Sequence, residues 1–285
     1  MNIEFIFETP HHNWSVLHVF KKYYEWFISK HNDINVSYKN SSDYYDGNPS
    51  GIYSPHNLVI TNLETKKCIV VSYWDRPIEI TWKNNGWDGR NVVEIICSSG
   101  TYPEMGFTPF SYLPYLTNFD DLSLNSKKMN DKTNNELEFK GFLYGERLNL
   151  SKLGKIKITN DKIFPVETYF NYLTDNKICL SLNGAGEICN RDMEILSSRS
   201  VLLRPNLTLE FHNKLIPNYH YISFEYSNDP HIQSQNIIDK FNEIKDNNNL
   251  LSFISENGYN WYLENGMVNS NVEILKEIIN INKLK

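Results

Sequence analysis

Several motifs that carry well-known chemistry are missing from this sequence of 285 residues. No His-X₃-His or Asp-X-Asp spacing occurs, and there is no Cys-X-X-Cys pair among the cysteines Cys68, Cys97, Cys179 and Cys189. These absences argue against a zinc site and against a disulfide framework, so we expect no metal and reduced, buried thiols. The sequence also lacks Gly-Lys-Ser/Thr, which excludes a Walker-type phosphate loop.

No stretch of the chain is strongly basic, and 28 Lys and Arg against 34 Asp and Glu give a net charge of −6. Because nucleic acids and anionic membranes attract positive surfaces, this balance predicts no nucleic-acid partner. No apolar run approaches the length of a transmembrane helix, and the first eight residues do not resemble a signal peptide. We therefore expect a cytoplasmic protein without a transmembrane segment.

Hydrophobic residues make up 40% of the chain, enough for packed cores, and the length favours two domains. In the first half, the apolar pattern predicts a helix over 16–27 and strands over 3–7, 34–38, 58–60, 68–73 and 92–97. Residues 118–135 are polar and without sustained periodicity, which is typical of a linker. The predicted domains are therefore 1–135 and 136–285.

The second half alternates strands with helices, which predicts an α/β domain. A strand that starts at Phe139 leads into a glycine-containing turn, and three more strands are expected over 178–182, 201–204 and 220–224. Helices are expected over 164–173, 187–197, 233–246, 250–264 and 271–282.

The clearest local pattern is Asn183-Gly184-Ala185-Gly186, which follows a buried strand and precedes a helix predicted from Glu187. Helix N-termini at the carboxyl ends of strands bind anions through free N–H groups, and glycines allow close approach to a phosphate. Arg191, about one turn into the helix, can add a charged hydrogen bond. A simple helix cap with surface ion pairs among Glu187, Arg191 and Glu194 would give the same pattern.

Two further patterns follow strands. In Trp74-Asp75-Arg76-Pro77, a carboxylate at the carboxyl end of a strand can act as a general base, or it can pair with Arg76 or start a turn before the proline. In Gly145-Glu146-Arg147, at the start of the predicted second domain, the arginine can reach into the cleft between the domains that Asp75 would face, or it can be solvated. His11 and His12 follow the first strand, either as substrate-side residues or as ordinary surface residues.

Several of these patterns occur in the order found in one enzyme family. The matching segments are Trp74–Pro77, Phe139-Lys140-Gly141 with Glu146-Arg147, the glycine turn with Arg191, Ser200-Val201, Leu215–Ile222, and Asn257-Gly258-Tyr259 with Trp261. Tyr102-Pro103 and Phe107 are a looser match. The chain thus resembles glycosyltransferase family 90, the capsule-associated and protein O-glucosyltransferases and O-xylosyltransferases. The likeness covers the second half well and the first half in patches.

The resemblance implies an α/β fold of the GT-B type, with two Rossmann-like domains that face a central cleft. It implies an inverting, metal-independent enzyme that moves a sugar from a UDP-sugar to a hydroxyl of a glycan or protein and needs no other cofactor. Residues 1–135 would bind the acceptor and residues 136–285 the nucleotide sugar. A viral or bacterial origin would agree with a cytoplasmic enzyme.

By matching motif, Asp75 would be the general base, and Arg147 and Arg191 would hold the donor diphosphate. The further donor-binding candidates are Gly145, Gly184, Ala185, Gly186 and Glu187, and the acceptor-side candidates are His11, His12, Trp74 and Tyr102. Two alternatives stay open. One is a GT-B enzyme with another donor nucleotide, such as GDP or dTDP, and the other is a non-catalytic module that binds glycans or nucleotides.

Overall fold

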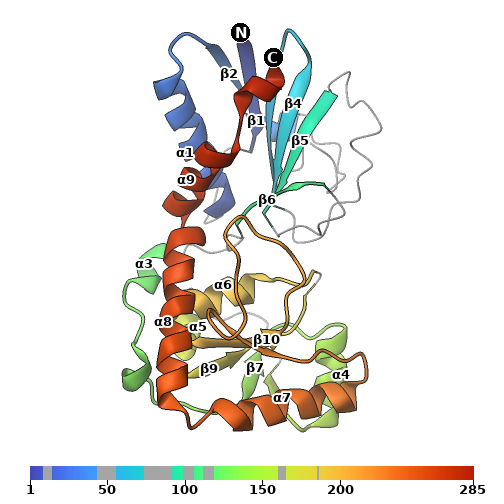
Figure 1. The fold of residues 1–285 in the computed structure, drawn as a ribbon, viewed down its shortest axis with the longest axis vertical. Coiled ribbons are helices and arrows are strands. Elements are labelled where there is room, and N and C mark those ends of the chain that lie inside the picture. The colour runs from blue at the N-terminus through green and yellow to red at the C-terminus, as the bar shows by residue number, and fades with distance from the viewer. Residues whose placement is uncertain are drawn as a thin grey trace. The chain divides into compact units, whose positions relative to one another are not determined.

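The computed structural model describes residues 1–8, 15–43, 56–73, 91–98, 106–111, 119–159, 165–184 and 186–285. The chain divides into two compact units (Figure 1). Unit 1 comprises Met1–Asn118, Leu209–Lys214 and Asn265–Lys285, and unit 2 comprises Phe119–Thr208 and Leu215–Glu264. No helix within the described part of the chain is long and apolar enough to cross a membrane.

Unit 1 contains a six-stranded sheet in the order β2-β1-β3-β4-β5-β6. Its strands are β1 (Asn2–Phe7), β2 (Asn35–Asn40), β3 (Asn57–Asn62), β4 (Lys67–Ser72), β5 (Asn91–Cys97) and β6 (Thr108–Pro109). Its helices are α1 (Ser15–Lys30), α9 (Val268–Ile278) and the short 3₁₀ helices η1 (Ser41–Asp43) and η4 (Ile281–Leu284).

The sheet of unit 1 is mixed, which corrects the expectation of a Rossmann-like first domain. β1 pairs with β2 in parallel, and so do β4 with β5 and β5 with β6, whereas β3 is antiparallel to both β1 and β4. The reason is local: only residues 63–66 connect β3 to β4, and so short a connection can join only antiparallel strands.

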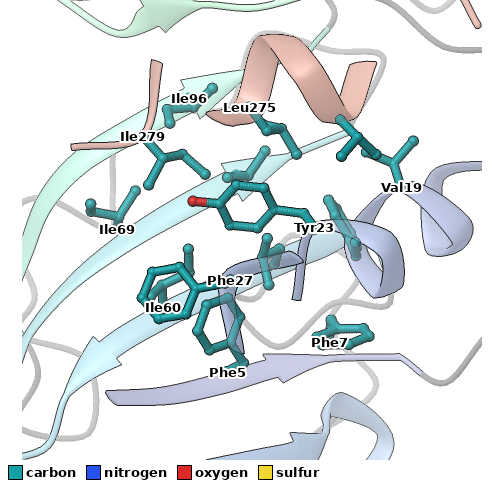
Figure 2. Packing of buried hydrophobic residues seen from close by; sticks show 14 of the residues in the cluster. Phe5, Phe7, Val19, Tyr23, Phe27, Ile60, Ile69, Ile96, Leu275 and Ile279 are labelled. Atoms are coloured by element: carbon teal, nitrogen blue, oxygen red, sulfur yellow. The ribbon is translucent and has the colours of Figure 1, made fainter. Parts of the chain in front are cut away.

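Helix α1 covers the sheet of unit 1 with an apolar face, and the C-terminal segment completes the same core. Figure 2 shows Leu275 of α9 and Ile279 beside Tyr23 of α1, with Phe5 and Phe27 close by. All five side chains are almost fully buried. The chain therefore returns to unit 1 after unit 2 is complete, because the apolar face of α9 packs against α1.

Among the residues of unit 2 that the structure describes, every pair of hydrogen-bonded strands is parallel. The strands are β7 (Glu138–Lys140), β8 (Lys157–Thr159), β9 (Ile178–Leu180), β10 (Val201–Pro205) and β11 (Ile222–Phe224). The helices are α3 (Asp120–Ser123), η3 (Met129–Asp131), α4 (Glu146–Leu153), α5 (Val166–Asp175), α6 (Asn190–Ser197), α7 (Pro230–Ile244) and α8 (Asn248–Asn265).

The two sheets of unit 2 have the orders β11-β10-β9 and β7-β8. β7 lies beside β9 (Figure 1). Just before these two strands, Asn134 and Asn176 form a parallel bridge. The spatial order is thus β8-β7-β9-β10-β11. Numbered along the chain this is 2-1-3-4-5, a doubly wound order whose direction reverses between β7 and β9.

The segment expected to be a linker is packed into unit 2, so the unit boundary lies before Phe119 rather than after residue 135. Phe119 contacts Phe170 of α5, and the buried Lys132 ammonium donates to the carbonyl oxygens of Thr174 and Ser198 and to Ser200 Oγ. A segment anchored by side-chain hydrogen bonds has no apolar periodicity, which explains why its sequence resembles a linker. The assignment of acceptor and donor roles to the two halves stays a prediction.

Candidate functional site

In an open parallel sheet, ligands bind beyond the carboxyl ends of the strands, at the point where the strand order reverses. In unit 2 this point lies between β7 and β9. The segments that follow these two strands are 141–145, which leads into α4, and 181–189, which leads into α6. They contain four of the six predicted donor-binding residues that the structure describes; the other two, Arg147 and Arg191, lie in the first turns of α4 and α6.

On the β7 side, Gly145 immediately precedes α4 and has φ of +53°, a conformation that favours glycine. It places Arg147 in the first turn of α4, where the side chain is only 6% exposed. Arg147 Nη2 donates to Leu182 O at 2.8 Å, so this arginine reaches the segment that follows β9. The predicted convergence of Arg147 with the glycine segment is therefore present in the fold.

On the β9 side, Gly184 lies under two side chains that come from the β7 side. A Cβ atom on Gly184 would lie 3.1 Å from the Tyr144 hydroxyl and 3.5 Å from Arg147 Nη2. The amide of Gly184 donates to Gly186 O at 3.0 Å, which closes a tight turn. The absence of a side chain at this position thus lets Tyr144 and Arg147 pack directly against the backbone of the segment after β9.

The helix that follows the glycines begins at Asn190, three residues later than the predicted start at Glu187. The Asp192 carboxylate accepts from Cys189 N at 2.7 Å and forms a capping box. Glu187 lies before the helix, where its carboxylate accepts from the amide and the hydroxyl of Thr208. An internal carboxylate, rather than free N–H groups, therefore occupies this helix N-terminus.

The sequence analysis did not identify Arg204, which organises this edge of the sheet. It lies in β10, is 1% exposed, and pairs with the fully buried Asp192 across 2.8 Å. Arg204 Nη2 also donates to Glu187 O at 2.8 Å. The sequence signal that could have predicted a buried charge here is an arginine directly after the apolar residues Val201–Leu203.

Arg191 lies partly buried in the first turn of α6, beside the end of β7. Its guanidinium carbon is 4.3 Å from the centroid of the Phe139 ring, and that of Arg147 is 5.2 Å from the same ring. A Cβ atom on Gly141 would lie 2.5 Å from Arg191 Nη2. The two predicted arginines therefore converge on one aromatic residue of β7, from two different helices.

Glu146, next to Arg147, carries a carboxyl group whose two oxygens are buried. The groups that face it are the backbone N–H of Asn183, the Tyr226 hydroxyl and the guanidinium groups of Arg147 and Arg204. Burial raises the pKa of this carboxyl, while these four neighbours act in the opposite direction. The site thus contains an acid that ionises less readily than an exposed glutamate.

Around these charged groups, three aromatic side chains remain exposed: Phe142, Tyr144 and Tyr226, with exposed fractions of 59%, 45% and 44%. Tyr144 lies beneath the Arg147 guanidinium at 4.8 Å, and Tyr226 faces Glu146. Exposed aromatic rings beside buried cations offer stacking surfaces for planar or sugar rings.

Six of the predicted site residues, His11, His12, Trp74, Asp75, Tyr102 and Ala185, lie outside the described residues. All four cysteines are described and free, and Cys68, Cys97 and Cys179 are buried. Within the described ranges, no group of three or more His, Cys, Asp and Glu side chains is arranged to hold a metal ion.

No protein-family model matches this chain, and no curated protein matches it in sequence. Similar solved structures include three of alpha-glucosyltransferases. One is bound to UDP-glucose and DNA containing an abasic site; it has 10% identity and a TM-score of 0.47, and covers 98% of this chain and 99% of that chain.

The other two contain UDP and a 13-mer DNA, with a central A:G mismatch in one and an HMU base in the other. Their identities are both 9%, with TM-scores of 0.49 and 0.46. They cover 96% and 97% of this chain and, in both cases, 98% of the other chain.

These structures correct one expectation from the sequence. All three contain DNA, so a negative net charge and the lack of a basic run do not exclude a nucleic-acid partner. The prediction of no nucleic-acid partner conflicts with these three structures, and net charge is not sufficient to support it, because it describes the whole molecule and not one of its surfaces.

Proposed function

We propose that this chain is a glycosyltransferase that moves a sugar from a UDP-sugar to an acceptor hydroxyl, and that unit 2 binds the donor diphosphate. One observation carries the proposal. At the switch point of a parallel sheet, Arg147 extends from α4 to the segment after β9 and packs against the backbone of a glycine in that segment. A cation held at the carboxyl ends of parallel strands is suited to bind a phosphate group.

The other groups at this edge fit the same ligand. Arg191 supplies a second cation near Arg147, and together they can stabilise the negative charge that develops on a departing UDP. Tyr144 and Tyr226 present exposed ring faces on which a uracil base can stack. Gly145, Gly186 and Glu187 shape the backbone around the diphosphate.

The chemical step is proposed from the sequence. Asp75 takes the proton of the acceptor hydroxyl, which attacks the anomeric carbon from the face opposite UDP, so the configuration inverts. His11, His12, Trp74 and Tyr102 contact the acceptor. The reaction needs no metal in this scheme, because Arg147 and Arg191 stabilise the leaving group. Membership of family 90 and the GT-B arrangement of two facing domains belong to the same proposal.

The first experiment measures thermal stabilisation of the full chain by UDP, GDP, CMP, dTDP and their sugars, with EDTA and with added divalent metal. Stabilisation by UDP-sugars in EDTA is expected. Stabilisation by another nucleotide alone would identify a different donor nucleotide. Stabilisation by none of them would contradict the proposal that unit 2 binds the donor.

The second experiment separates an enzyme from a binding module. Sugar release and transfer are followed with oligosaccharides, peptides and duplex DNA with and without an HMU base, since DNA accompanies the similar glucosyltransferases. Transfer to any acceptor supports the proposal. Donor binding without hydrolysis or transfer would indicate a non-catalytic module. Asp75→Asn is expected to bind the donor and to lose turnover; full turnover would exclude Asp75 as the base.

A further inference from the structure

The two arginines of the candidate site form no ion pair with a carboxylate of the described residues. Elsewhere in unit 2, the buried Arg204 pairs with Asp192, but no ion pair within the described part of the chain includes Arg147 or Arg191. Arg147 is only 6% exposed, and a charge in such a position is unfavourable unless another group stabilises it. The contacts of these two guanidinium groups therefore show how the fold tolerates them.

Aromatic rings, rather than carboxylates, contact both guanidinium groups. The centroid of the fully buried Phe139 ring lies 4.3 Å from the guanidinium carbon of Arg191 and 5.2 Å from that of Arg147. Each arginine also has a ring of its own, Tyr169 at 5.6 Å from Arg191 and Tyr144 at 4.8 Å from Arg147. A cation within about 6 Å of a ring centroid is attracted by the negative face of the ring. Phe139 is thus the ring that the two arginines share.

A ring stabilises a guanidinium group without using its N–H donors. Arg191 donates no hydrogen bond to any described residue. Arg147 Nη2 donates to Leu182 O, but its Nε has no partner in the described part of unit 2. A carboxylate in the place of the Phe139 ring would accept such donors and neutralise the charge. The ring leaves the charge of both arginines, and most of their donors, available to a ligand.

The shared ring also limits the distance between the two cations. The guanidinium carbons of Arg147 and Arg191 can be no farther apart than the sum of their distances to the Phe139 centroid. A diphosphate has two anionic groups joined through one oxygen, so one such ligand can accept charged hydrogen bonds from both arginines. A monophosphate has only one anionic group and cannot engage both cations equally well.

We propose that Phe139 is a positioning residue of the donor site, whose ring holds Arg147 and Arg191 together without neutralising them and so sets the preference for a diphosphate over a monophosphate. The inference rests on the proposed function, since it requires the donor diphosphate to bind at these two arginines. Because the Phe139 side chain is fully buried, it acts through the arginines and not by touching the ligand.

The test changes the electrostatics of the ring and keeps its shape. Fluorine atoms withdraw electrons from the face of the ring, so each added fluorine weakens its attraction for a cation. In the full chain, Phe139 is replaced by mono-, di- and trifluorophenylalanine, and the dissociation constant of UDP-glucose is measured for each. The same replacements at Phe170 are the control, because this ring is also buried in unit 2 but contacts the Phe119 ring and no cation among the described residues.

The dissociation constant is expected to rise with each fluorine on Phe139, by about three- to tenfold for the trifluoro ring, and to stay unchanged in the Phe170 series. A ring that only fills the core would give no such trend. A constant that does not vary along the Phe139 series, or that varies equally along the Phe170 series, overturns the inference while the donor site stands. Failure of UDP-glucose to bind the unmodified chain overturns both.

A second measurement compares UDP with UMP as ligands of the unmodified chain, Phe139→Leu and Phe170→Leu. Leucine keeps an apolar side chain at position 139 but removes the ring that both arginines share. The preference for UDP over UMP is expected to fall about tenfold in Phe139→Leu, the effect of weakening one charged hydrogen bond, and to persist in Phe170→Leu. An unchanged preference in a folded Phe139→Leu chain contradicts the inference. If Phe139→Leu does not fold, the fluorinated chains supply the same comparison of UDP with UMP.

Discussion

Arg204 Nη1 lies 2.8 Å from the Asp192 carboxylate, and both side chains are buried at the carboxyl edge of the unit 2 sheet. Asp192 caps α6, and Arg204 also holds Glu187 O. This one ion pair therefore fixes the position of the segment 183–189 relative to β10. The geometry of the candidate donor site depends on a pair of charges that need not touch the donor.

Removing the charge of Asp192 is expected to destabilise unit 2 strongly. Asp192→Asn leaves Arg204 buried without a counter-charge, which costs about 3–5 kcal/mol in the free energy of unfolding. The measurement is urea unfolding followed by a probe in unit 2. Glu256→Gln is the matched control, since Glu256 is the half-exposed partner of Arg199 and such a pair contributes about 0–1 kcal/mol. Equal effects of the two substitutions would contradict this view of the buried pair.

Gly141 is expected to determine where Arg191 lies. In Gly141→Ala, the new Cβ would lie 2.5 Å from Arg191 Nη2, so the guanidinium must move away from Phe139. Donor affinity is expected to fall roughly three- to tenfold, about 0.7–1.4 kcal/mol, the size of a weakened charged hydrogen bond. The measurement is the dissociation constant of UDP-glucose.

Gly154→Ala is the control for this substitution. Gly154 also has positive φ, but a Cβ atom there meets no other atom within 4 Å. The Gly154→Ala variant therefore introduces strain at a positive φ but no new contact with Arg191. If both variants bind the donor equally well, the contact between Gly141 and Arg191 does not matter for the site.

Much of the fold follows from periodicity, whereas the details of the site do not. The short apolar runs of β1, β3 and β4 and the helical spacing of α1, α7 and α8 predict these elements almost to their ends. Helix α4 was not predicted, because only Arg147 and Leu150 of its eight residues are buried, and this leaves no apolar stripe.

The late start of α6 has a local cause, the capping box between Cys189 and Asp192, which are three residues apart. Two other features depend on residues farther apart in the sequence: the burial of Arg204 depends on Asp192 and Glu187, and the place of α9 depends on α1. No local pattern encodes such partners. The glycine segment and Arg147, by contrast, have local signals and were identified as site residues.

Acid is expected to destabilise unit 2 through His220. The Nδ1 atom of His220 accepts a hydrogen bond from Ile216 N at 2.9 Å, and burial lowers the pKa of the ring to about 4. An unfolded histidine has a pKa near 6.5, so the unfolded chain binds more protons between these values. Stability is therefore complete above about pH 6.5 and is lost as pH falls towards 4.

The measurement is the urea midpoint of unit 2 at several values of pH in this window. His220→Asn keeps an acceptor for Ile216 N without a titrating group, so its midpoint is expected to depend less on pH. His231→Asn, at an exposed position in α7, is the control and is expected to behave like the unmodified chain. An unchanged pH dependence in His220→Asn would assign the acid sensitivity to other groups.

The last residues of the chain are expected to hold the sheet of unit 1 together. The carbonyl oxygen of Leu284 accepts from Asn62 Nδ2 at 3.0 Å and from Thr65 Oγ1 at 2.7 Å, and the Leu284 side chain is fully buried. Lys283 pairs with the buried Glu94 carboxylate of β5 at 2.7 Å. Through these contacts, η4 ties the β3–β4 turn to β5.

Deletion of residues 281–285 removes the buried leucine, worth about 1.5–3 kcal/mol, and leaves Glu94 without Lys283. The expected result is faster hydrogen exchange in β3, β4 and β5, with little change in β9 and β10 of unit 2. Lys283→Met is the narrower control, because it keeps the buried leucine and loses only the charge beside Glu94. If exchange rises equally in both units after the deletion, the two units do not unfold separately, and the contribution of η4 extends beyond the sheet that it contacts.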